Sequence, residues 1–241
     1  MHIMRKTKLS VNLNKVALIR NSRGGNYPDL VKVAMDCEQF GADGITIHPR
    51  PDERHAKYSD IPALKQIVKT ELNIEGYPSD RFMKIILNTR PHQCTLVPDP
   101  PDALTSDTGW DTRKHQNFLK EICNALKEEG IRSSVFINPD PGLMESAKMT
   151  GADRIELYTG PYAKSFDVNP ENAVQPYREA ARTALEYGLE INAGHDLNLR
   201  NLRYFIQEVP EVAEVSIGHA LVTDALYYGL QNTIHLYINC L

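Results

Sequence analysis

The chain has 241 residues, of which 41% are hydrophobic and 24% are charged, with a formal net charge of −4. This length suits one large α/β domain or two small ones. A general nucleic-acid binder usually carries an excess of basic residues, so we expect no nucleic-acid partner. No stretch approaches the ~20 apolar residues of a membrane helix, and the four cysteines lack metal-ligand or C-x-x-C spacing. We therefore expect a cytoplasmic protein with reduced thiols and no membrane association.

Apolar runs bounded by turn residues alternate along the chain with segments of helical periodicity. The expected strands are 8–13, 44–48, 72–75, 93–97, 133–137, 154–158, 189–193 and 214–218. Two expected helices begin at residues 28 and 79. Further helices are expected over 61–68, 111–129, 139–150, 171–187 and 198–207, and a last helical segment begins at about residue 220. Residues 16–25 are expected to be a loop, and the long connection 98–110 is a candidate lid.

Eight βα units in a chain of this length predict a (β/α)₈ TIM barrel that covers residues 1–241 as a single domain. A doubly wound open sheet is the alternative, but the run Arg23-Gly24-Gly25 does not fit its glycine-rich fingerprint G-x-G-x-x-G. The segment from about residue 220 carries more apolar side chains than a lone barrel needs. We expect that segment to lie at an oligomer interface.

In such a barrel, active-site residues lie at the carboxyl ends of the strands. The stretch 44–55 shows the pattern, because a β-branched run ends there in His48, Arg50, Arg54 and His55. The other strand ends supply Asn12, Asn14, Lys15, Glu75, Glu156, Asn192, His195, Gly218 and His219. A buried carboxylate is costly unless it is paired or functional. Each of these residues could be structural alone, but together they predict an active site.

Small residues end the last two expected strands, at Gly194 and Gly218. Loops at these positions commonly bind phosphate in this fold, through backbone N–H groups and helix N-termini. Cationic side chains that could add charge-assisted bonds are Lys15, Arg23, Arg50, Arg54 and His55. The sequence therefore predicts small phosphorylated ligands.

Short segments occur in a fixed order: V-N-L-N-K-V-A-L-I-R-N-S-R-G, G-A-D-G-I-T-I-H-P-R-x-D-E-R-H, N-I-E, C-T-L-V-P, I-E-L-Y-T-G-x-Y-A, I-N-A-G-H and I-G-H-A. With these segments the chain resembles the pyridoxine 5'-phosphate synthase family, from about Leu9 to about Tyr228. The resemblance implies a cofactor-free condensation of 3-amino-2-oxopropyl phosphate with 1-deoxy-D-xylulose 5-phosphate. Its products would be pyridoxine 5'-phosphate, phosphate and water. The resemblance also implies a homo-octamer.

The resemblance assigns residues one by one. Acid–base positions fall to His48, Glu75 and His195, and a transition-state stabiliser to Glu156. Contacts with the amino-ketone phosphate fall to Asn12, Arg23, Gly218 and His219. Contacts with the deoxyxylulose phosphate fall to Arg50, His55 and Thr105, and further substrate-binding positions to Asn14, Lys15 and Asp196. The chain departs from the family pattern where Asn14-Lys15 replaces Asp-His, where Asp196 replaces a glycine, and in the run after Pro98.

Other functions remain open at this point. A phosphosugar isomerase or an aldolase on the same barrel is one alternative. An aldolase of the Schiff-base type would use Lys15, the one lysine expected at a strand end. A metal-dependent lyase could use His48, His195 and His219 as ligands. A non-catalytic binder of phosphate esters is a further possibility.

Overall fold

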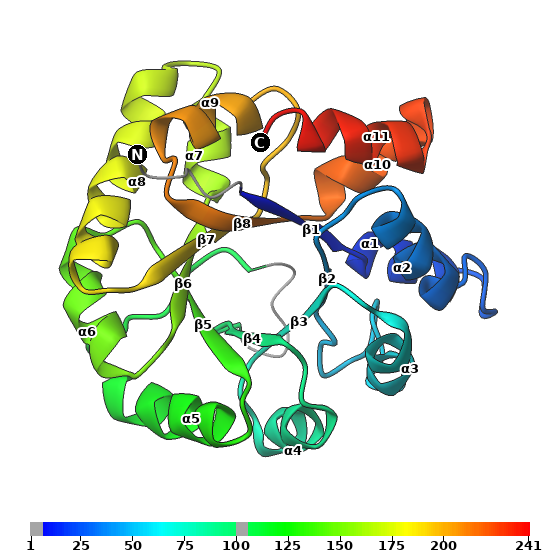
Figure 1. Ribbon diagram of the computed structural model, residues 1–241, viewed down its shortest axis with the longest axis horizontal. Helices are drawn as coiled ribbons and strands as arrows, with labels where there is room; N and C mark the ends of the chain where they lie inside the picture. The colour runs from blue at the N-terminus through cyan, green and yellow to red at the C-terminus, as the bar shows by residue number, and fades with distance from the viewer. Residues whose placement is uncertain (1–6, 100–105) are drawn as a thin grey trace.

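The computed structural model describes residues 7–99 and 106–241. Eight parallel strands, each paired with the next along the chain, close into a barrel when β8 pairs with β1 (Figure 1). The strands are β1 (Lys8–Asn12), β2 (Gly44–Ile47), β3 (Glu71–Gly76), β4 (Gln93–Leu96), β5 (Arg132–Ile137), β6 (Arg154–Tyr158), β7 (Glu190–Gly194) and β8 (Val212–Ile217). The predicted (β/α)₈ barrel is confirmed, and the open-sheet alternative is wrong.

Helices surround the barrel on the outside (Figure 1). They are α1 (Asn14–Asn21), α2 (Leu30–Gln39), α3 (Asp60–Ile67), α4 (Asp80–Thr89), α5 (Gln116–Glu128), α6 (Met144–Met149), α7 (Gly160–Ser165), α8 (Pro170–Glu186), α9 (Leu202–Glu208), α10 (His219–Tyr228) and α11 (Leu230–Ile238), with a 3₁₀ turn at Pro141–Leu143. Within the described ranges, none of these helices has the length and apolar character needed to cross a membrane.

The structure corrects the expected helices in three places. The loop expected at 16–25 is largely the helix α1, which starts directly after β1 and has no side-chain N-cap to mark it. Helix α7 was not expected, because its Gly-Pro start is typical of a turn. The last helical segment is two helices, separated at Gly229 by a backbone φ of +77° that suits glycine.

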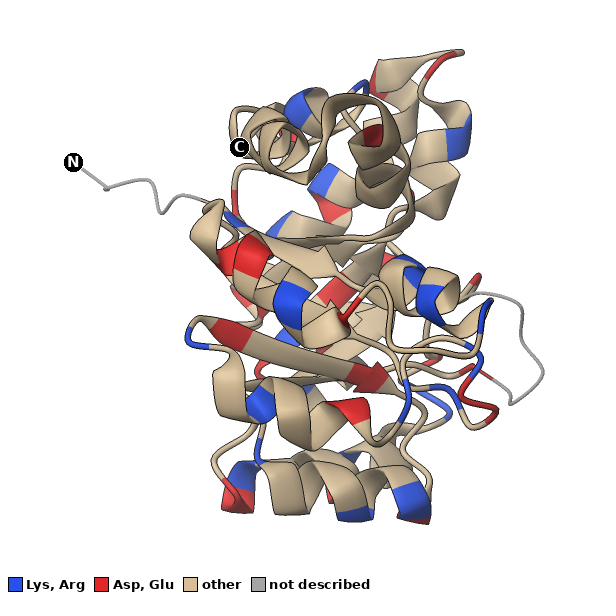
Figure 2. Cartoon of the chain, turned by 90° about the vertical axis from the view of Figure 1, so that its right-hand side faces the viewer, with Lys and Arg blue, Asp and Glu red and all other residues tan. Residues whose placement is uncertain are grey.

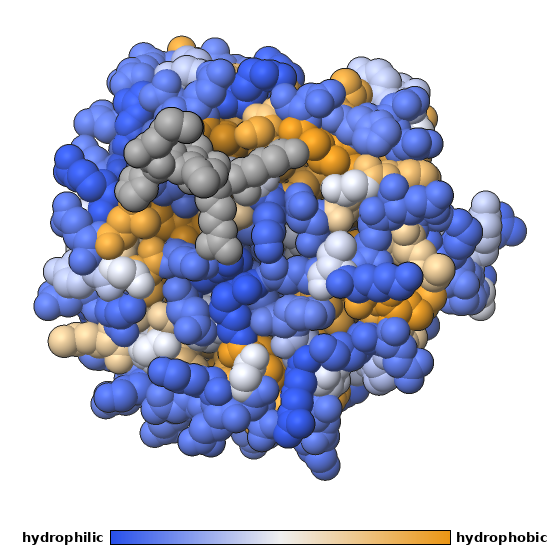
Figure 3. All heavy atoms as spheres, viewed as in Figure 1, coloured by the Kyte–Doolittle hydropathy of each residue, from blue (hydrophilic) through white to orange (hydrophobic). Residues whose placement is uncertain are grey.

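The two faces of the barrel wall differ in chemistry. On β3, Leu72 and Ile74 are fully buried in the apolar core, which the helices complete. The alternate residues of each strand are mostly polar, and they bond across the barrel: Gln93 of β4 donates to Glu214 of β8 at 3.3 Å, and Asn192 of β7 donates to Gln93 at 3.3 Å. Hydrophilic residues accordingly occupy the middle of the face in Figure 3, with hydrophobic patches around them.

Arg154 lies at the centre of this polar interior and is only 3% exposed. Its guanidinium donates to Glu190 at 2.7 Å, to Gln93 at 3.1 Å and to Asn192 at 3.3 Å. The carboxylates of Glu71 and Glu214 each lie 3.9 Å from its Nη1. Arg154 therefore lies between two buried anions at the amino end of the barrel, and Arg132 and Lys8 also pair with Glu71. Elsewhere along the chain, residues of both charges are interspersed (Figure 2).

We predict that Arg154→Met lowers the free energy of unfolding by about 3–5 kcal/mol, because it removes the cation that pairs with buried Glu214 and one of the three that pair with Glu71. Urea unfolding followed by circular dichroism measures this loss. The matched control is Arg200→Met, which removes a pair of equal length, 2.7 Å to Asp167, between side chains 74% and 58% exposed. It should cost under about 1 kcal/mol. Equal losses in the two variants would contradict the assigned role of Arg154.

Candidate active site

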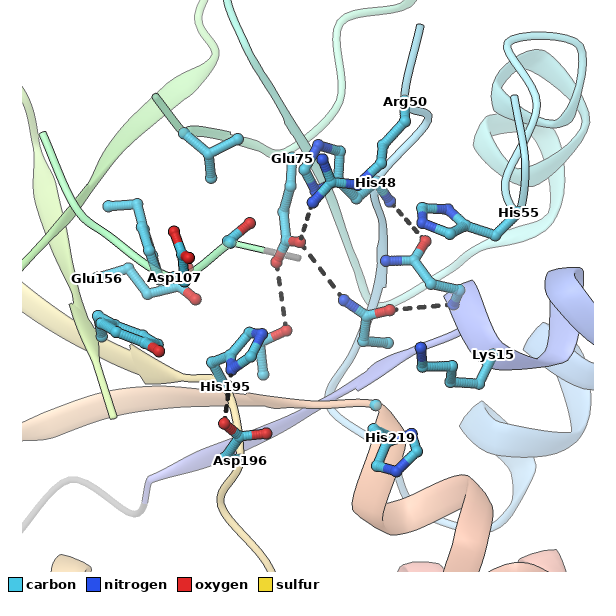
Figure 4. Close-up of a pocket in the computed structure, with 18 of the residues that line it drawn as sticks. Lys15, His48, Arg50, His55, Glu75, Asp107, Glu156, His195, Asp196 and His219 are labelled. Carbon is cyan, nitrogen blue, oxygen red and sulfur yellow. Dashed lines mark hydrogen bonds and ion pairs between the residues drawn. The ribbon is translucent and has the colours of Figure 1, made fainter. Parts of the chain in front are cut away.

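A cavity of about 500 Å³ opens at the carboxyl ends of the strands. The predicted site residues line it, with four exceptions. Asn192 instead bonds Gln93 and Glu214 inside the barrel, and Arg54 pairs with Asp52 outside the lining. Arg23 is exposed and lies outside the lining, and Thr105 falls outside the described residues. Figure 4 shows the labelled side chains converging on this space from strands and loops far apart in the sequence. The structure thus brings together the imidazoles, carboxylates and cations that the strand ends predicted.

Glu75 occupies the centre of the cavity near the end of β3. Its Oε2 lies 3.8 Å from His48 Nδ1 and accepts a hydrogen bond from Asn12 Nδ2 at 3.4 Å. Its Oε1 accepts from Ser216 Oγ at 3.5 Å. Side chains from β1, the end of β2 and β8 therefore orient a single carboxyl group.

Burial decides the protonation of this pair. It raises the pKa of Glu75 well above its ordinary value, and the negative charge of Glu156 raises it further. Burial lowers the pKa of His48 well below its ordinary value, and the guanidinium of Arg50 adds to this effect. Both shifts favour a neutral carboxyl group, which can donate a proton, 3.8 Å from a neutral imidazole, which can accept one.

Glu156, on β6, lies deeper in the barrel and is 4% exposed. Thr95 Oγ1 donates to its Oε2 at 3.4 Å. The backbone of Gly194 approaches so closely that a Cβ there would lie 2.3 Å from Glu156 Oε1. The glycine at the end of β7 therefore makes room for this carboxyl group, in addition to ending the strand.

Arg50 provides the main buried cation of the cavity and is 4% exposed. Its Nη2 donates at 2.7 Å to Asp99 Oδ2, which also accepts from Ser106 Oγ at 2.5 Å. Burial, followed by the charge of Arg50, lowers the pKa of neighbouring His55 to about 4. His55 is therefore a neutral hydrogen-bonding group at physiological pH.

Asn14, at the start of α1, holds two strand ends together. Its backbone N–H donates to Asn12 Oδ1 at 3.0 Å, and its Oδ1 accepts from the backbone N–H of His48 at 2.9 Å. The amide oxygen of Asn14 thus does what a carboxylate oxygen would do at this position. Lys15, the next residue, also lines the cavity (Figure 4).

Several cavity residues were missed from the sequence. Tyr158 and Ser216 follow Glu156 and Glu214 by two positions on their strands, so the period-two rule could have found both. Lys164 belongs to the unexpected helix α7, and Asp107 to the long connection, where no periodic pattern points inward.

The three histidines predicted as possible metal ligands do not form a metal site among the described residues. In the part of the chain that the structure describes, no three His, Cys, Asp or Glu side chains come together as metal ligands would. His48, His195 and His219 line the same cavity without forming such a group.

We predict that Glu156→Gln stabilises the protein increasingly as pH rises. Burial raises the pKa of Glu156 from 4.5 to about 8. The stability associated with its proton is therefore complete below pH 4.5 and lost as pH approaches about 8. The gain of the variant over the wild type should grow across this interval by about 1–3 kcal/mol in urea unfolding.

The control for this prediction is Glu186→Gln, at an exposed position that ends α8. Its stability difference from the wild type should stay constant with pH. A pH-independent difference for Glu156→Gln as well would show that Glu156 is ionised in the folded protein over the whole range.

Both the fold and the sequence of this chain are similar to those of known proteins. Solved structures with similar folds include thiamine phosphate pyrophosphorylase from Pyrococcus furiosus, with a TM-score of 0.64 at 12% identity, covering 99% of this chain and 97% of that one. Phosphoribosyl anthranilate isomerase from Thermus thermophilus gives 0.61 at 10% identity, covering 97% of this chain and 98% of that one. At such identities only the barrel fold is shared.

Sequence similarity is much closer to proteins named pyridoxine 5'-phosphate synthase. That of Bacteroides thetaiotaomicron is 57% identical over 98% of this chain and 99% of its own length. That of Cytophaga hutchinsonii is 60% identical over 96% of this chain and 98% of its own length. The family model described as pyridoxal phosphate biosynthesis protein PdxJ matches residues 9–241. The chain therefore belongs to the PdxJ family of pyridoxal phosphate biosynthesis enzymes.

Proposed function

We propose that the chain is a pyridoxine 5'-phosphate synthase that condenses 3-amino-2-oxopropyl phosphate with 1-deoxy-D-xylulose 5-phosphate by general acid–base catalysis. The observation that carries the proposal is the Glu75–His48 pair, with its 3.8 Å separation, at the centre of an enclosed cavity. The close similarity to proteins named for this activity supports it. The cavity of about 500 Å³ is large enough for two small phosphoesters side by side.

The reaction needs repeated proton transfers. The amine of one substrate attacks the carbonyl of the other, the adduct loses water to form an imine, phosphate leaves, and the ring closes with loss of a second water molecule. Under this proposal Glu75 gives a proton to the departing hydroxyl group and His48 takes one from nitrogen or carbon. His195 serves the amino-ketone half and ring closure. Each positioned acid or base contributes ~10²–10⁴-fold to the rate.

Cationic and hydrogen-bonding side chains at the rim support the binding of two phosphate groups. In Figure 4 they lie to the right of Glu75, with Arg50 and His55 above Lys15 and His219. Gly218 and His219 form the start of α10, whose free backbone N–H groups favour an anion. We propose that the first group binds the deoxyxylulose phosphate and the second the amino-ketone phosphate, with Asn12 beside it.

Glu156 has a different proposed part. Its carboxyl group is buried on β6, with a pKa that burial and Glu214 both raise. A protonated carboxyl group there can donate a hydrogen bond to oxygen that becomes negative as bonds rearrange, and no reorganisation is needed. We propose this as the basis of transition-state stabilisation.

We predict that Glu75→Gln lowers kcat by about 10²–10⁴-fold while both substrates still bind, because the amide keeps the shape but cannot transfer the proton. Formation of pyridoxine 5'-phosphate from the two phosphoesters measures kcat, and calorimetric titration measures binding. The matched control is Glu71→Gln, which changes the same residue type at the other end of β3. Its turnover should stay within a few-fold of wild type. Near-normal turnover in Glu75→Gln would refute the role of Glu75.

We also propose that the chain forms a homo-oligomer, which the family resemblance suggests is an octamer, and that it works in the cytoplasm, where its four free cysteines stay reduced. Apolar side chains on α10 and α11 support the first proposal. Leu226 is 76% exposed, Tyr227 82% and Tyr228 52%, a concentration that a monomer rarely leaves in water.

We predict that Leu226→Lys combined with Tyr227→Lys lowers the molar mass measured by light scattering, because charge at this face opposes its burial against another copy. Tyr187→Lys, which changes a 39% exposed tyrosine just after α8, should leave the mass of the wild-type assembly unchanged. A monomeric wild-type protein would overturn the oligomer proposal.

A further inference from the structure

The turn that follows β7 has an unusual backbone. His195 has a φ of +78° and Asp196 a φ of +63°, so two consecutive non-glycine residues adopt the left-handed conformation. A side chain makes this conformation unfavourable, and glycine would adopt it without strain. Strained residues of this kind persist where the surrounding structure holds them and their side chains are needed.

The surroundings hold this turn firmly. The hydroxyl group of Thr159, which is fully buried, donates at 2.7 Å to the carbonyl oxygen of Gly194 and also contacts that of His195. The Tyr158 ring lies edge-on to the His195 imidazole, with centroids 5.5 Å apart. The turn is therefore anchored through its main chain, and the imidazole packs against an aromatic wall of the cavity.

The second strained residue faces the first. Asp196 Oδ2 lies 3.0 Å from His195 Nδ1, and Figure 4 shows the two side chains pointing toward each other at the edge of the cavity. The contact with His195 holds the pKa of Asp196 below its ordinary value, and the nearby charges of His219 and Lys164 act in the same direction. Asp196 is thus an ionised carboxylate, which can only accept hydrogen bonds.

We propose that Asp196 is a positioning residue that holds His195 in the tautomer with hydrogen on Nδ1. The other ring nitrogen, Nε2, is then the unprotonated one and can take a proton from the substrate. When it does so, the imidazolium ion that forms is stabilised by the adjacent carboxylate, as general-base histidines require. The inference rests on the proposed function, in which His195 is an acid–base group.

This role differs from the substrate contact that the sequence analysis assigned to Asp196. An ionised carboxylate would repel a phosphate group placed beside it, whereas it stabilises a histidine that gains positive charge. The strain at two adjacent residues also fits a requirement for both side chains, because a phosphate contact through backbone N–H groups would be served at least as well by glycine.

The test combines nuclear magnetic resonance with kinetics. Ring nitrogen-15 shifts of His195, assigned by difference from His195→Gln and recorded at mildly alkaline pH, report which nitrogen carries hydrogen. In the wild type we expect hydrogen on Nδ1. In Asp196→Gly we expect the neutral ring to shift toward hydrogen on Nε2, which is the commoner form when no acceptor faces Nδ1. Asp107→Asn, which removes another carboxylate from the same cavity, should leave the His195 shifts unchanged.

Kinetics and stability give the second measurement. In Asp196→Gly and Asp196→Asn, kcat should fall by at least about tenfold while KM changes less than about threefold. The melting temperature of Asp196→Gly should not fall, since glycine relieves strain. A loss of kcat that follows a loss of folded protein would instead indicate a structural role and overturn the proposal.

The two proposals can fail separately. If the His195 tautomer is the same in the wild type and both Asp196 variants, the positioning role is wrong even when pyridoxine 5'-phosphate is made. If the tautomer changes as expected but the wild type makes no pyridoxine 5'-phosphate, the pairing of His195 and Asp196 stands and the proposed function fails.

Discussion

A buried charge must have a partner, and this requirement shapes the whole inside of the barrel. TIM barrels usually fill their interior with branched apolar side chains. Here the apolar residues face the helices, and the interior holds a network in which Arg154, Gln93, Asn192 and Glu214 satisfy one another. The apolar packing that stabilises the protein therefore lies between the strands and the helices, and the inside of the barrel contains polar side chains.

The candidate site continues that interior toward the carboxyl ends of the strands. Glu75 lies on the same strand and the same face as Glu71. Lys8 Nζ lies 3.2 Å from Glu71, whereas Arg50, the cation whose charge acts on Glu75, is itself paired with Asp99. At the amino end of the barrel, opposite charges offset the free-energy cost of desolvating the carboxylates. At the carboxyl end, Glu75 avoids that cost because burial raises its pKa and it keeps its proton. The cost of burying a charge thus leads to a network of ion pairs at the amino end of the barrel and to proton donors and acceptors at its carboxyl end.

The strands and most of the candidate site could be predicted from the sequence. Buried apolar runs are explicit in a sequence, and in a parallel barrel the residue after each run lies at the mouth, so His48 and His219 could be placed without coordinates. Helix α1 could not be placed, because its start depends in part on Asn14 bonding the backbone of His48, which is distant in the sequence. The pairing of Asp196 with His195 was equally invisible, since it depends on two left-handed residues that composition does not disclose.

The seam between β1 and β8 has a consequence for how the protein is made. Lys8 pairs with Glu214 and Val11 with Ile217. The edge of β1 that pairs with β8 therefore stays unpaired until β8 has been synthesised. Until then the cavity is incomplete, because Glu75 is bonded both by Asn12 near the start of the chain and by Ser216 on β8. A ribosome-bound intermediate would carry an open strand edge and no assembled cavity, which makes late synthesis the stage at which this enzyme most needs protection from aggregation.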